Sequence, residues 1–230
     1  MINPKQQRIF ERHLAHVPGS HILKASEYKK VVSCLHYKKI AKGQNLVDQH
    51  DDRNYTFILK KGFLKIRSFD AKEDASYVSF LSPNMLFPLR GMFVDSRYCY
   101  TVTALTNAEV IFIPTKTFEG LLKSNHKFSL MIIKKMQEVV SEEEIFIQRA
   151  LTPSATKRVE QVLKYLNNHH GIELEGGRQI PFPLTIKEIA TIAGTTRETA
   201  GQVIHELVDE TELEYSRKYL FFPEIYTEEA

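Results

Sequence analysis

The residues with the most specific hydrogen-bonding chemistry lie together between positions 196 and 202. They are Thr196, Arg197, Glu198, Thr199 and Gln202. Arginine can bond guanine through two N–H groups, glutamate can accept from the cytosine amino group, and glutamine can pair with adenine. Threonine hydroxyls near a helix N-terminus reach phosphate. On the exposed face of one helix, these side chains suit the major groove of a DNA duplex.

Two short helices are predicted to position these side chains. Thr185 to Glu188 and Thr195 to Glu198 both match Thr-x-x-Glu, in which the hydroxyl and the carboxylate bond free backbone N–H groups at a helix start. Small residues between the helices allow close approach and a turn: Ala190, Ala193 and Gly194. Apolar residues supply the inner face of the second helix: Ala200, Val203, Ile204 and Leu207. The ordered set predicts a helix-turn-helix.

A solvated helix face is the alternative interpretation of this stretch. It accounts for Glu198 as a cap, but it gives no reason for Arg197 and Gln202 on the same exposed side. We therefore favour a nucleic-acid contact.

Other elements of the second half surround the motif. An amphipathic helix ending at Gly171 is predicted by Val159, Val162, Leu163 and Leu166. Residues 172–182 and 214–222 each indicate a hairpin. The second hairpin has a basic tip, Arg217 and Lys218, which either touches phosphates as the wing of a winged helix or carries ordinary turn charges.

The first half has the pattern of short strands. Segments rich in β-branched and aromatic residues occur at 55–59, 63–67, 77–81, 100–104 and 110–113. Such spacing is typical of a sandwich or barrel. Gly43 and Gly62 are predicted to lie in tight turns, where glycine adopts positive φ at little cost.

A long helix is predicted from Phe128 to Leu151. The seam pattern of a coiled coil is carried by Ile132, Met136, Val139, Glu143, Phe146 and Ala150. A second row widens the apolar face: Ile133, Val140 and Ile147. The seam predicts a homodimer, and a buried helix of a monomer remains the alternative because the pattern covers fewer than four heptads. Glu143 either sets the register or lies at a solvated edge.

Composition excludes several classes of protein. The 230 residues are 43% hydrophobic and 26% charged, as in soluble globular proteins. No apolar run approaches the ~20 residues of a membrane span, and the N-terminus lacks a secretory pattern, so we expect a cytoplasmic protein without membrane contact. With only Cys34 and Cys99, zinc-ribbon and four-cysteine iron–sulfur sites are excluded, and we expect no metal or cofactor.

Catalysis is not indicated by any cluster of residues. Cys34 and His36 share a predicted strand face but lack a third orienting group, so we expect a protein that is not an enzyme. The adjacent His169 and His170 lack the spacing of a metal site and are better explained as partners of a helix C-terminus.

Charge is distributed unequally about a boundary at Thr152-Pro153-Ser154, where proline disfavours helix at the preceding residue. Residues 1–152 carry a net charge of +8 and residues 153–230 carry −5. A negative second half weakens the attraction to phosphates. The rival hypothesis is therefore a ligand-binding or protein-interaction module that kept the fold and lost DNA binding.

The run from Arg197 to Ile204 closely resembles the DNA-recognition helix of the Crp/Fnr superfamily of bacterial transcription regulators. The resemblance implies an α+β fold in three parts: a β-roll over 1–124, which is a jelly roll like that of cyclic-nucleotide-binding domains, a dimerisation helix over 125–152, and a winged helix-turn-helix over 153–230. It implies a homodimer on a pseudo-palindromic site in double-stranded DNA. An activator of this type would also contact RNA polymerase.

Residue roles follow from the same resemblance. Arg197 and Glu198 would read base edges, whereas Gln202 stands where cyclic-AMP-responsive members have a second base-reading arginine. Phosphate contacts would come from Thr185, Thr196 and Thr199. The predicted DNA-contacting set is Thr185, Thr195, Thr196, Arg197, Glu198, Thr199, Gln202, Arg217 and Lys218.

The region that holds the nucleotide in the family departs from its pattern. Residues 86–91 stand in place of the family's Gly-Glu-Leu cassette, and residues 98–101 stand in place of its Arg-Ser pair. We therefore expect no dependence on cyclic AMP. The effector and its ligand-binding residues stay unassigned. Arg90 and Arg97 either hold an anionic effector or are surface charges, and Cys99 is either a redox sensor or a buried thiol. The recognition run looks most like Gram-positive members such as the arginine-deiminase-pathway activators.

Overall fold

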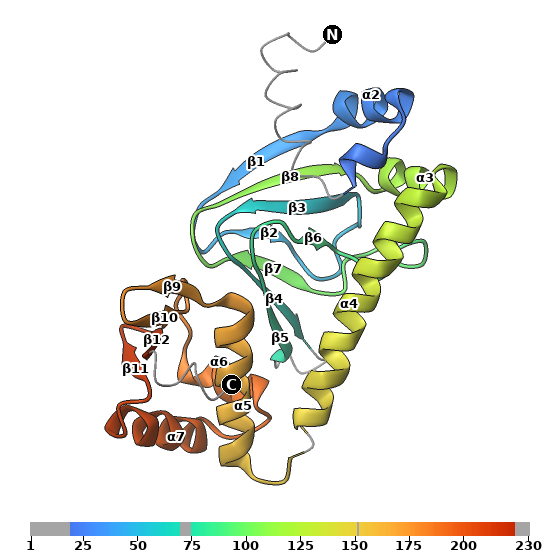
Figure 1. Ribbon diagram of the computed structural model, residues 1–230. Coiled ribbons are helices and arrows are strands. Elements are labelled where there is room, and N and C mark those ends of the chain that lie inside the picture. Colours follow the sequence, from blue (N-terminus) through green and yellow to red (C-terminus); the bar gives the residue numbers. More distant parts are fainter. Residues whose placement is uncertain (1–18, 70–74, 151, 224–230) are drawn as a thin grey trace. The chain divides into compact units, whose positions relative to one another are not determined.

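The computed structural model describes residues 19–69, 75–150 and 152–223 (Figure 1). The chain divides into two compact units. The first comprises the chain up to Ser68 together with Phe80–Ser141, and the second comprises Phe69–Ser79 and the chain from Glu142 onward. Within the described residues, no helix has the length and apolar character that a membrane span requires.

Two four-stranded sheets form the β-roll. One has the order β1 (His36–Ile40), β8 (Ala108–Pro114), β3 (Tyr55–Lys61) and β6 (Leu86–Phe87). The other has the order β2 (Asn45–Val47), β7 (Thr101–Ala104), β4 (Leu64–Phe69) and β5 (Ala75–Leu81). Every predicted strand coincides with or overlaps an observed one. Gly43 and Gly62 have φ of 86° and 85°, which confirms their predicted turns.

The core between the sheets is apolar and aromatic. Phe57 stacks on Phe87 at a centroid distance of 5.4 Å and contacts Tyr98 and Phe112 at 6.3 and 5.7 Å. Burial of such rings is a main source of stability because apolar area removed from water contributes roughly 25 cal/mol per Å². These rings belong to one core cluster of apolar and aromatic side chains.

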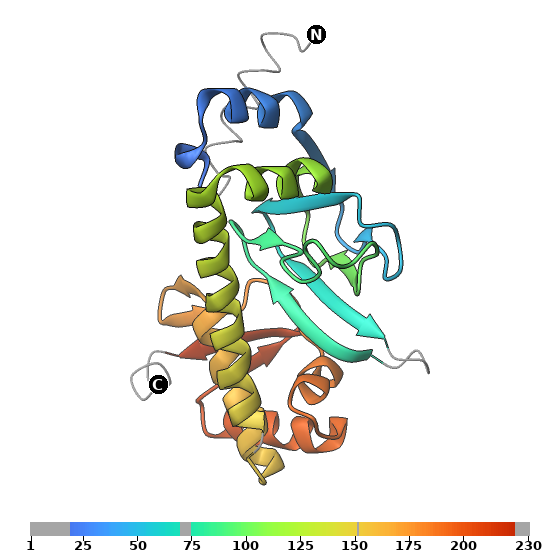
Figure 2. The same cartoon turned by 90° about the vertical axis from the view of Figure 1, so that its right-hand side faces the viewer.

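Three helices cover the other face of the β1–β8–β3 sheet. They are α2 (Ala25–Cys34), α3 (Thr115–Ser124) and the first turns of α4 (His126–Ala150), and Figure 2 shows α3 turning sharply into α4. The Asn125 side chain accepts from the Phe128 N–H at 3.0 Å and so begins α4. The sequence pattern predicts neither α2 nor α3. It predicts α4 to within two residues at its N-terminus, and the expected last residue, Leu151, lies outside the described residues.

The second unit contains a three-helix cluster and a small sheet. Helix α5 (Ala155–His170) begins at the N-cap Ser154 and ends before Gly171, as predicted. A β-carbon on Gly171 would lie 2.4 Å from the Asn167 carbonyl oxygen, so only glycine fits there. The sheet has the order β11 (Glu214–Ser216), β12 (Tyr219–Pro223), β10 (Gly177–Gln179) and β9 (Ile172–Leu174). Both predicted hairpins are therefore confirmed.

Candidate DNA-binding surface

Helix α6 (Ile186–Ile192) is started by the predicted capping box. The Thr185 hydroxyl accepts from the Glu188 N–H at 3.2 Å, and the Glu188 carboxylate accepts from the Thr185 N–H at 2.9 Å. The Thr185 hydroxyl also donates to the same carboxylate at 2.8 Å. This side chain therefore has a structural role besides any contact with phosphate.

Helix α7 (Arg197–Asp209) begins one residue later than the second predicted box requires. The N-cap is Thr196, whose hydroxyl accepts from the Thr199 N–H at 3.2 Å, so the prediction of a Thr195–Glu198 box is wrong. The reason is the preceding turn: Gly194 adopts φ 58°, and the Thr195 N–H donates to the Ala190 carbonyl at 3.0 Å. Thr195 is thereby part of the turn.

The two faces of α7 differ as predicted. Its inner face is buried through Ala200, Val203, Ile204 and Leu207. Arg197, Glu198 and Gln202 are exposed. Hydrogen bonds from its own backbone N–H and from Thr196 lower the pKa of the Glu198 carboxyl, which keeps it an acceptor.

One exposed side chain of α7 that the sequence analysis did not single out is Glu206. Its carboxylate accepts from the Gln202 amide at 3.0 Å. The i, i+4 spacing within α7 could have revealed this pair. The Gln202 amide is therefore already engaged by Glu206 in the free chain.

The β11–β12 hairpin presents the predicted basic tip. Arg217 and Lys218 form its two-residue turn with φ of 51° and 71°, values that suit Asn-Gly and cost energy for longer side chains. Both residues are exposed. The hairpin is tied to the start of α6, because the Tyr215 hydroxyl donates to the Leu184 carbonyl at 2.9 Å and the Leu184 N–H donates to the Lys218 carbonyl at 2.7 Å.

The predicted dimer seam on α4 requires correction. Ile132 is only 2% exposed in the core of the first unit, and the Phe146 ring contacts Tyr165 of α5 at 5.7 Å. The Glu143 carboxylate accepts from the Tyr77 hydroxyl at 2.9 Å. These three side chains lie on one side of α4, and each contacts other residues of the same chain. They are therefore not available to a second copy.

The exposed apolar row of α4 is the second one, shifted by one residue or about 100°. Ile133, Val140 and Ile147 are 48–57% exposed at intervals of seven residues. Met136 and Val139 of the predicted seam are also exposed, at 37% and 39%. Ala150 ends the helix, and its side chain lies outside the described residues.

Comparison with known proteins supports a common family for the whole arrangement. Residues 37–125 match the family model of the cyclic nucleotide-binding domain. Proteins named HTH-type transcriptional regulator ArcR are 28% identical over 176 residues in Staphylococcus haemolyticus strain JCSC1435 and 26% identical over 183 residues in Staphylococcus aureus strain JH1. The alignments cover 76% and 80% of this chain and 77% and 76% of those relatives.

Solved structures share the fold. The c-di-GMP responsive global regulator CLP of Xanthomonas campestris superposes with a TM-score of 0.70 at 15% identity, covering 87% of this chain and 99% of that one. A transcriptional regulator of the CRP/FNR family from Thermus thermophilus gives 0.66 at 19% identity, covering 84% and 95%. The domain match, the ArcR relatives and the shared fold together support placing the chain in the Crp/Fnr superfamily. Its named relatives are transcription regulators and not enzymes.

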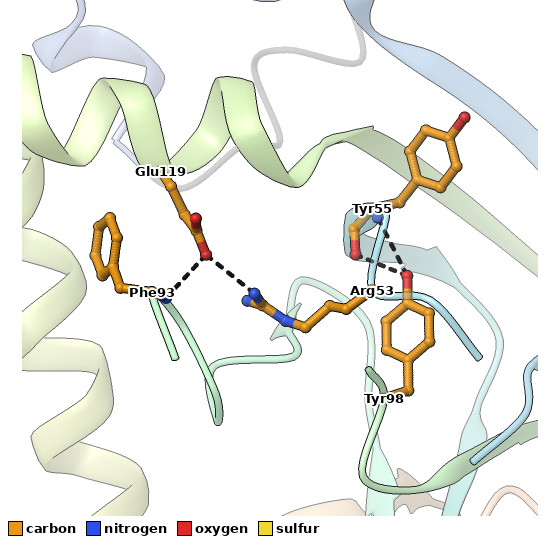
Figure 3. A network of polar contacts seen from close by, with 5 residues as sticks. All are labelled: Arg53, Tyr55, Phe93, Tyr98 and Glu119. Carbon is orange, nitrogen blue, oxygen red and sulfur yellow. Dashed lines mark hydrogen bonds and ion pairs between the residues drawn. The ribbon is translucent and has the colours of Figure 1, made fainter. Parts of the chain in front are cut away.

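Tyr98 lies in the segment that the resemblance matches to the Arg-Ser pair of the family, and it is part of the core of the roll. Its ring is buried, and its hydroxyl donates to the Tyr55 carbonyl at 3.0 Å while accepting from the Tyr55 N–H at 3.2 Å (Figure 3). Burial raises the pKa of the Tyr98 hydroxyl, so it stays protonated and able to donate. Tyrosine here fixes the roll to its own backbone.

A buried ion pair holds the neighbouring loop. The Arg53 guanidinium, whose side chain is 2% exposed, donates to the Glu119 carboxylate at 3.0 Å, and the same oxygen accepts from the Phe93 N–H at 2.9 Å (Figure 3). Burial opposes the charge, but these two donors prevail and lower the pKa of the Glu119 carboxyl. No sequence pattern reveals this pair, because its members are 66 residues apart.

The remaining residues considered for chemistry do not form a site. Cys34 ends α2 while His36 begins β1, so the two do not share a strand face as predicted. Burial raises the pKa of both the Cys34 and the Cys99 thiol, which disfavours the reactive thiolate. Arg90 and Arg97 are both exposed.

The two adjacent histidines differ from one another. His169 is exposed, whereas His170 is buried against the Phe182 ring at 5.7 Å. Burial, and secondarily the nearby His169, lowers the pKa of His170 to about 4. His170 is therefore neutral near pH 7 and is not the cationic helix-end partner that the sequence predicts.

Proposed function

We propose that this Crp/Fnr protein is a sequence-specific DNA-binding transcription regulator that acts as a homodimer on a pseudo-palindromic operator. The observation that carries the proposal is the exposed set at the start of α7, Arg197, Glu198 and Gln202, on a helix whose opposite face is fully buried. The basic tip at Arg217 and Lys218 supports it as a phosphate contact. RNA polymerase would be a further partner of an activator.

The exposed row Ile133, Val140 and Ile147 supports the homodimer. Two copies of this row would bury one another along a two-fold axis, since residues seven apart stay in register in a supercoil. Two recognition helices would then enter successive major grooves, about 34 Å apart. The operator should therefore have two-fold symmetry.

Independence from cyclic AMP is supported by the buried Tyr98. Its ring and two hydrogen bonds occupy the position where the family resemblance places the Arg-Ser pair, and neither Tyr98 nor Cys99 supplies a cation for a phosphate. The effector class stays open.

Selection from a random duplex pool tests the function directly. We expect the purified full chain to enrich a two-fold symmetric motif, with affinity that falls steeply with salt because phosphates are neutralised. If the same chain enriches no motif, with or without cell extract and reductant, the rival module that has lost DNA binding is favoured.

Replacing Arg197 with alanine should cost about 1–3 kcal/mol of binding free energy and relax specificity at one base pair. Affinities for operators varied at each position provide the measurement. Arg197→Lys is the matched control, because it keeps the charge but loses the two-pronged N–H fork. If Arg197→Ala lowered the affinity equally for all operator sequences, and Arg197→Lys bound as tightly as the wild type, Arg197 would be a phosphate contact instead.

Replacing Arg217 and Lys218 together with Asn and Gly should stabilise the fold and weaken DNA binding. Asn-Gly suits the positive φ of both positions, which we expect to add about 1–2 kcal/mol to the free energy of unfolding. Loss of two phosphate contacts should make the slope of log affinity against log salt shallower by about two. Urea unfolding and salt titration measure the two effects; an unchanged slope would identify the basic tip as ordinary turn charges.

A further inference from the structure

One arginine of the second unit joins two segments that are far apart in sequence. Arg158, in the first turns of α5, donates from Nε to the Ala193 carbonyl at 2.9 Å and from Nη2 to the Gly194 carbonyl at 3.1 Å. Its Nη1 donates to the Thr152 and Pro153 carbonyls at 2.9 and 3.1 Å. A single guanidinium thus holds four carbonyl oxygens.

The first pair of carbonyls lies in the turn of the helix-turn-helix. Ala193 caps the C-terminus of α6 and Gly194 follows it, where the helix presents unsatisfied carbonyls and the negative end of its dipole. Only Thr195 and Thr196 separate this turn from Arg197, the first residue of α7. Any displacement of the turn therefore displaces the base-reading end of α7.

The second pair of carbonyls lies in the linker between α4 and α5. Thr152 and Pro153 come directly before the α5 N-cap, Ser154. The linker is also held to α5 by the Thr152 hydroxyl, which donates to the Gln161 side chain at 3.4 Å. The end of α4 is held to α5 by the contact of the Phe146 ring with Tyr165. A displacement of the last turns of α4 would therefore also displace the linker carbonyls that Arg158 bonds.

We propose that Arg158 is the positioning residue that couples the end of the dimerisation helix to the recognition helix. Movement at Thr152–Pro153 is passed through the guanidinium to the Ala193–Gly194 turn, and so to Arg197. The proposal rests on the function proposed above and adds to it the route by which a change in the dimer regulates DNA contact.

The geometry requires arginine and not merely a positive charge. The planar guanidinium presents donors on both edges, so one edge serves the turn and the other serves the linker. Lysine has a single ammonium and cannot bridge both pairs. The backbone of Arg158 is fixed by its buried neighbour Val159, so the fork is held in place by α5.

Hydrogen–deuterium exchange of the full chain tests the coupling without DNA. We expect Arg158→Lys to raise amide exchange in residues 193–196 by about 10-fold or more, because hydrogen bonds from a charged donor are lost. Lys157→Met, which removes a charge from the adjacent exposed position, is the matched control and should leave this segment unchanged. Unchanged exchange in Arg158→Lys would overturn the proposal.

A double-mutant cycle separates coupling from local support of the turn. Pro153→Gly loosens the linker and should raise exchange at residues 193–196 in the wild-type background, with little further effect in Arg158→Lys. Additive effects of the two substitutions would show that linker and turn are independent, which would overturn the proposal.

DNA binding provides a second readout. Arg158→Lys should weaken operator binding about 10- to 100-fold with an unchanged salt slope, because Arg158 acts through the turn and not on phosphate. A slope shallower by about one would identify a phosphate contact and overturn the proposal. If the wild-type chain enriched no DNA motif, the proposed function would fail, while the exchange experiments would still decide the role of Arg158.

Discussion

Val140→Glu should convert the homodimer to monomers and weaken operator binding by about 100- to 10,000-fold. In the dimer, binding of one recognition helix raises the effective concentration of the second at its half-site, and a monomer loses this advantage. Val140 is the middle residue of the exposed row on α4. In a parallel dimer two glutamates would face each other in an apolar seam, where unpaired charge is strongly disfavoured. Sedimentation equilibrium and affinity for the selected operator measure the two effects.

Two controls on the same helix sharpen this prediction. Ile145→Glu alters a residue that is as exposed as Val140, at 48%, but lies on the far side of the helix, so the dimer should persist. Val139→Glu tests the row that the sequence pattern favours and should have the smaller effect. A dimer that survives Val140→Glu but not Val139→Glu would place the seam on the row through Ile132 and Phe146 after all.

Acid should destabilise the second unit by about 3 kcal/mol through His170 alone. Its pKa is about 4 in the folded chain and 6.5 without burial. Between these values the unfolded chain binds the proton and the folded chain does not, so the free energy of unfolding falls as pH drops from about 6.5 to about 4. At 1.36 kcal/mol per pKa unit the loss is about 3 kcal/mol, and none of it is felt above neutrality.

Urea unfolding at about pH 7.5 and about pH 4.5 measures this effect, with the full chain followed by signals from the second unit. His170→Leu should remove the pH-dependent part, whereas His169→Gln, which changes the exposed neighbour, should keep it. Because carboxyl groups also titrate below pH 5, the comparison between variants carries the result. Equal pH dependence in His170→Leu and wild type would show that His170 is protonated without cost.

The sequence predicted best where the determining contacts are local. The capping box at Thr185, the stop at Gly171 and the basic turn at Arg217 depend on residues a few positions apart, and all three are found in the structure. The start of α7 was displaced by one residue because the left-handed Gly194 and the Thr195 bond to Ala190 lengthen the turn.

Prediction was weaker where the partner is distant in sequence. Two adjacent apolar rows on α4 are equally periodic, and the choice between them depends on what covers each one, such as Tyr165 over Phe146. The bonds from Arg158 to the turn at Ala193 and from Arg53 to Glu119 carry no local pattern, since these partners lie 35 and 66 residues away. Periodicity identifies an apolar face, but tertiary packing decides which face remains open.

The burial of Tyr98 in the core of the roll sets a threshold for any molecule that would bind in its place. Such a molecule must first displace a buried ring and two hydrogen bonds to Tyr55, at a cost on the order of 4 kcal/mol. Its apparent affinity would then be about a thousandfold below its intrinsic affinity. A metabolite with weak intrinsic affinity would therefore not bind there, and only a ligand with strong contacts of its own could displace Tyr98.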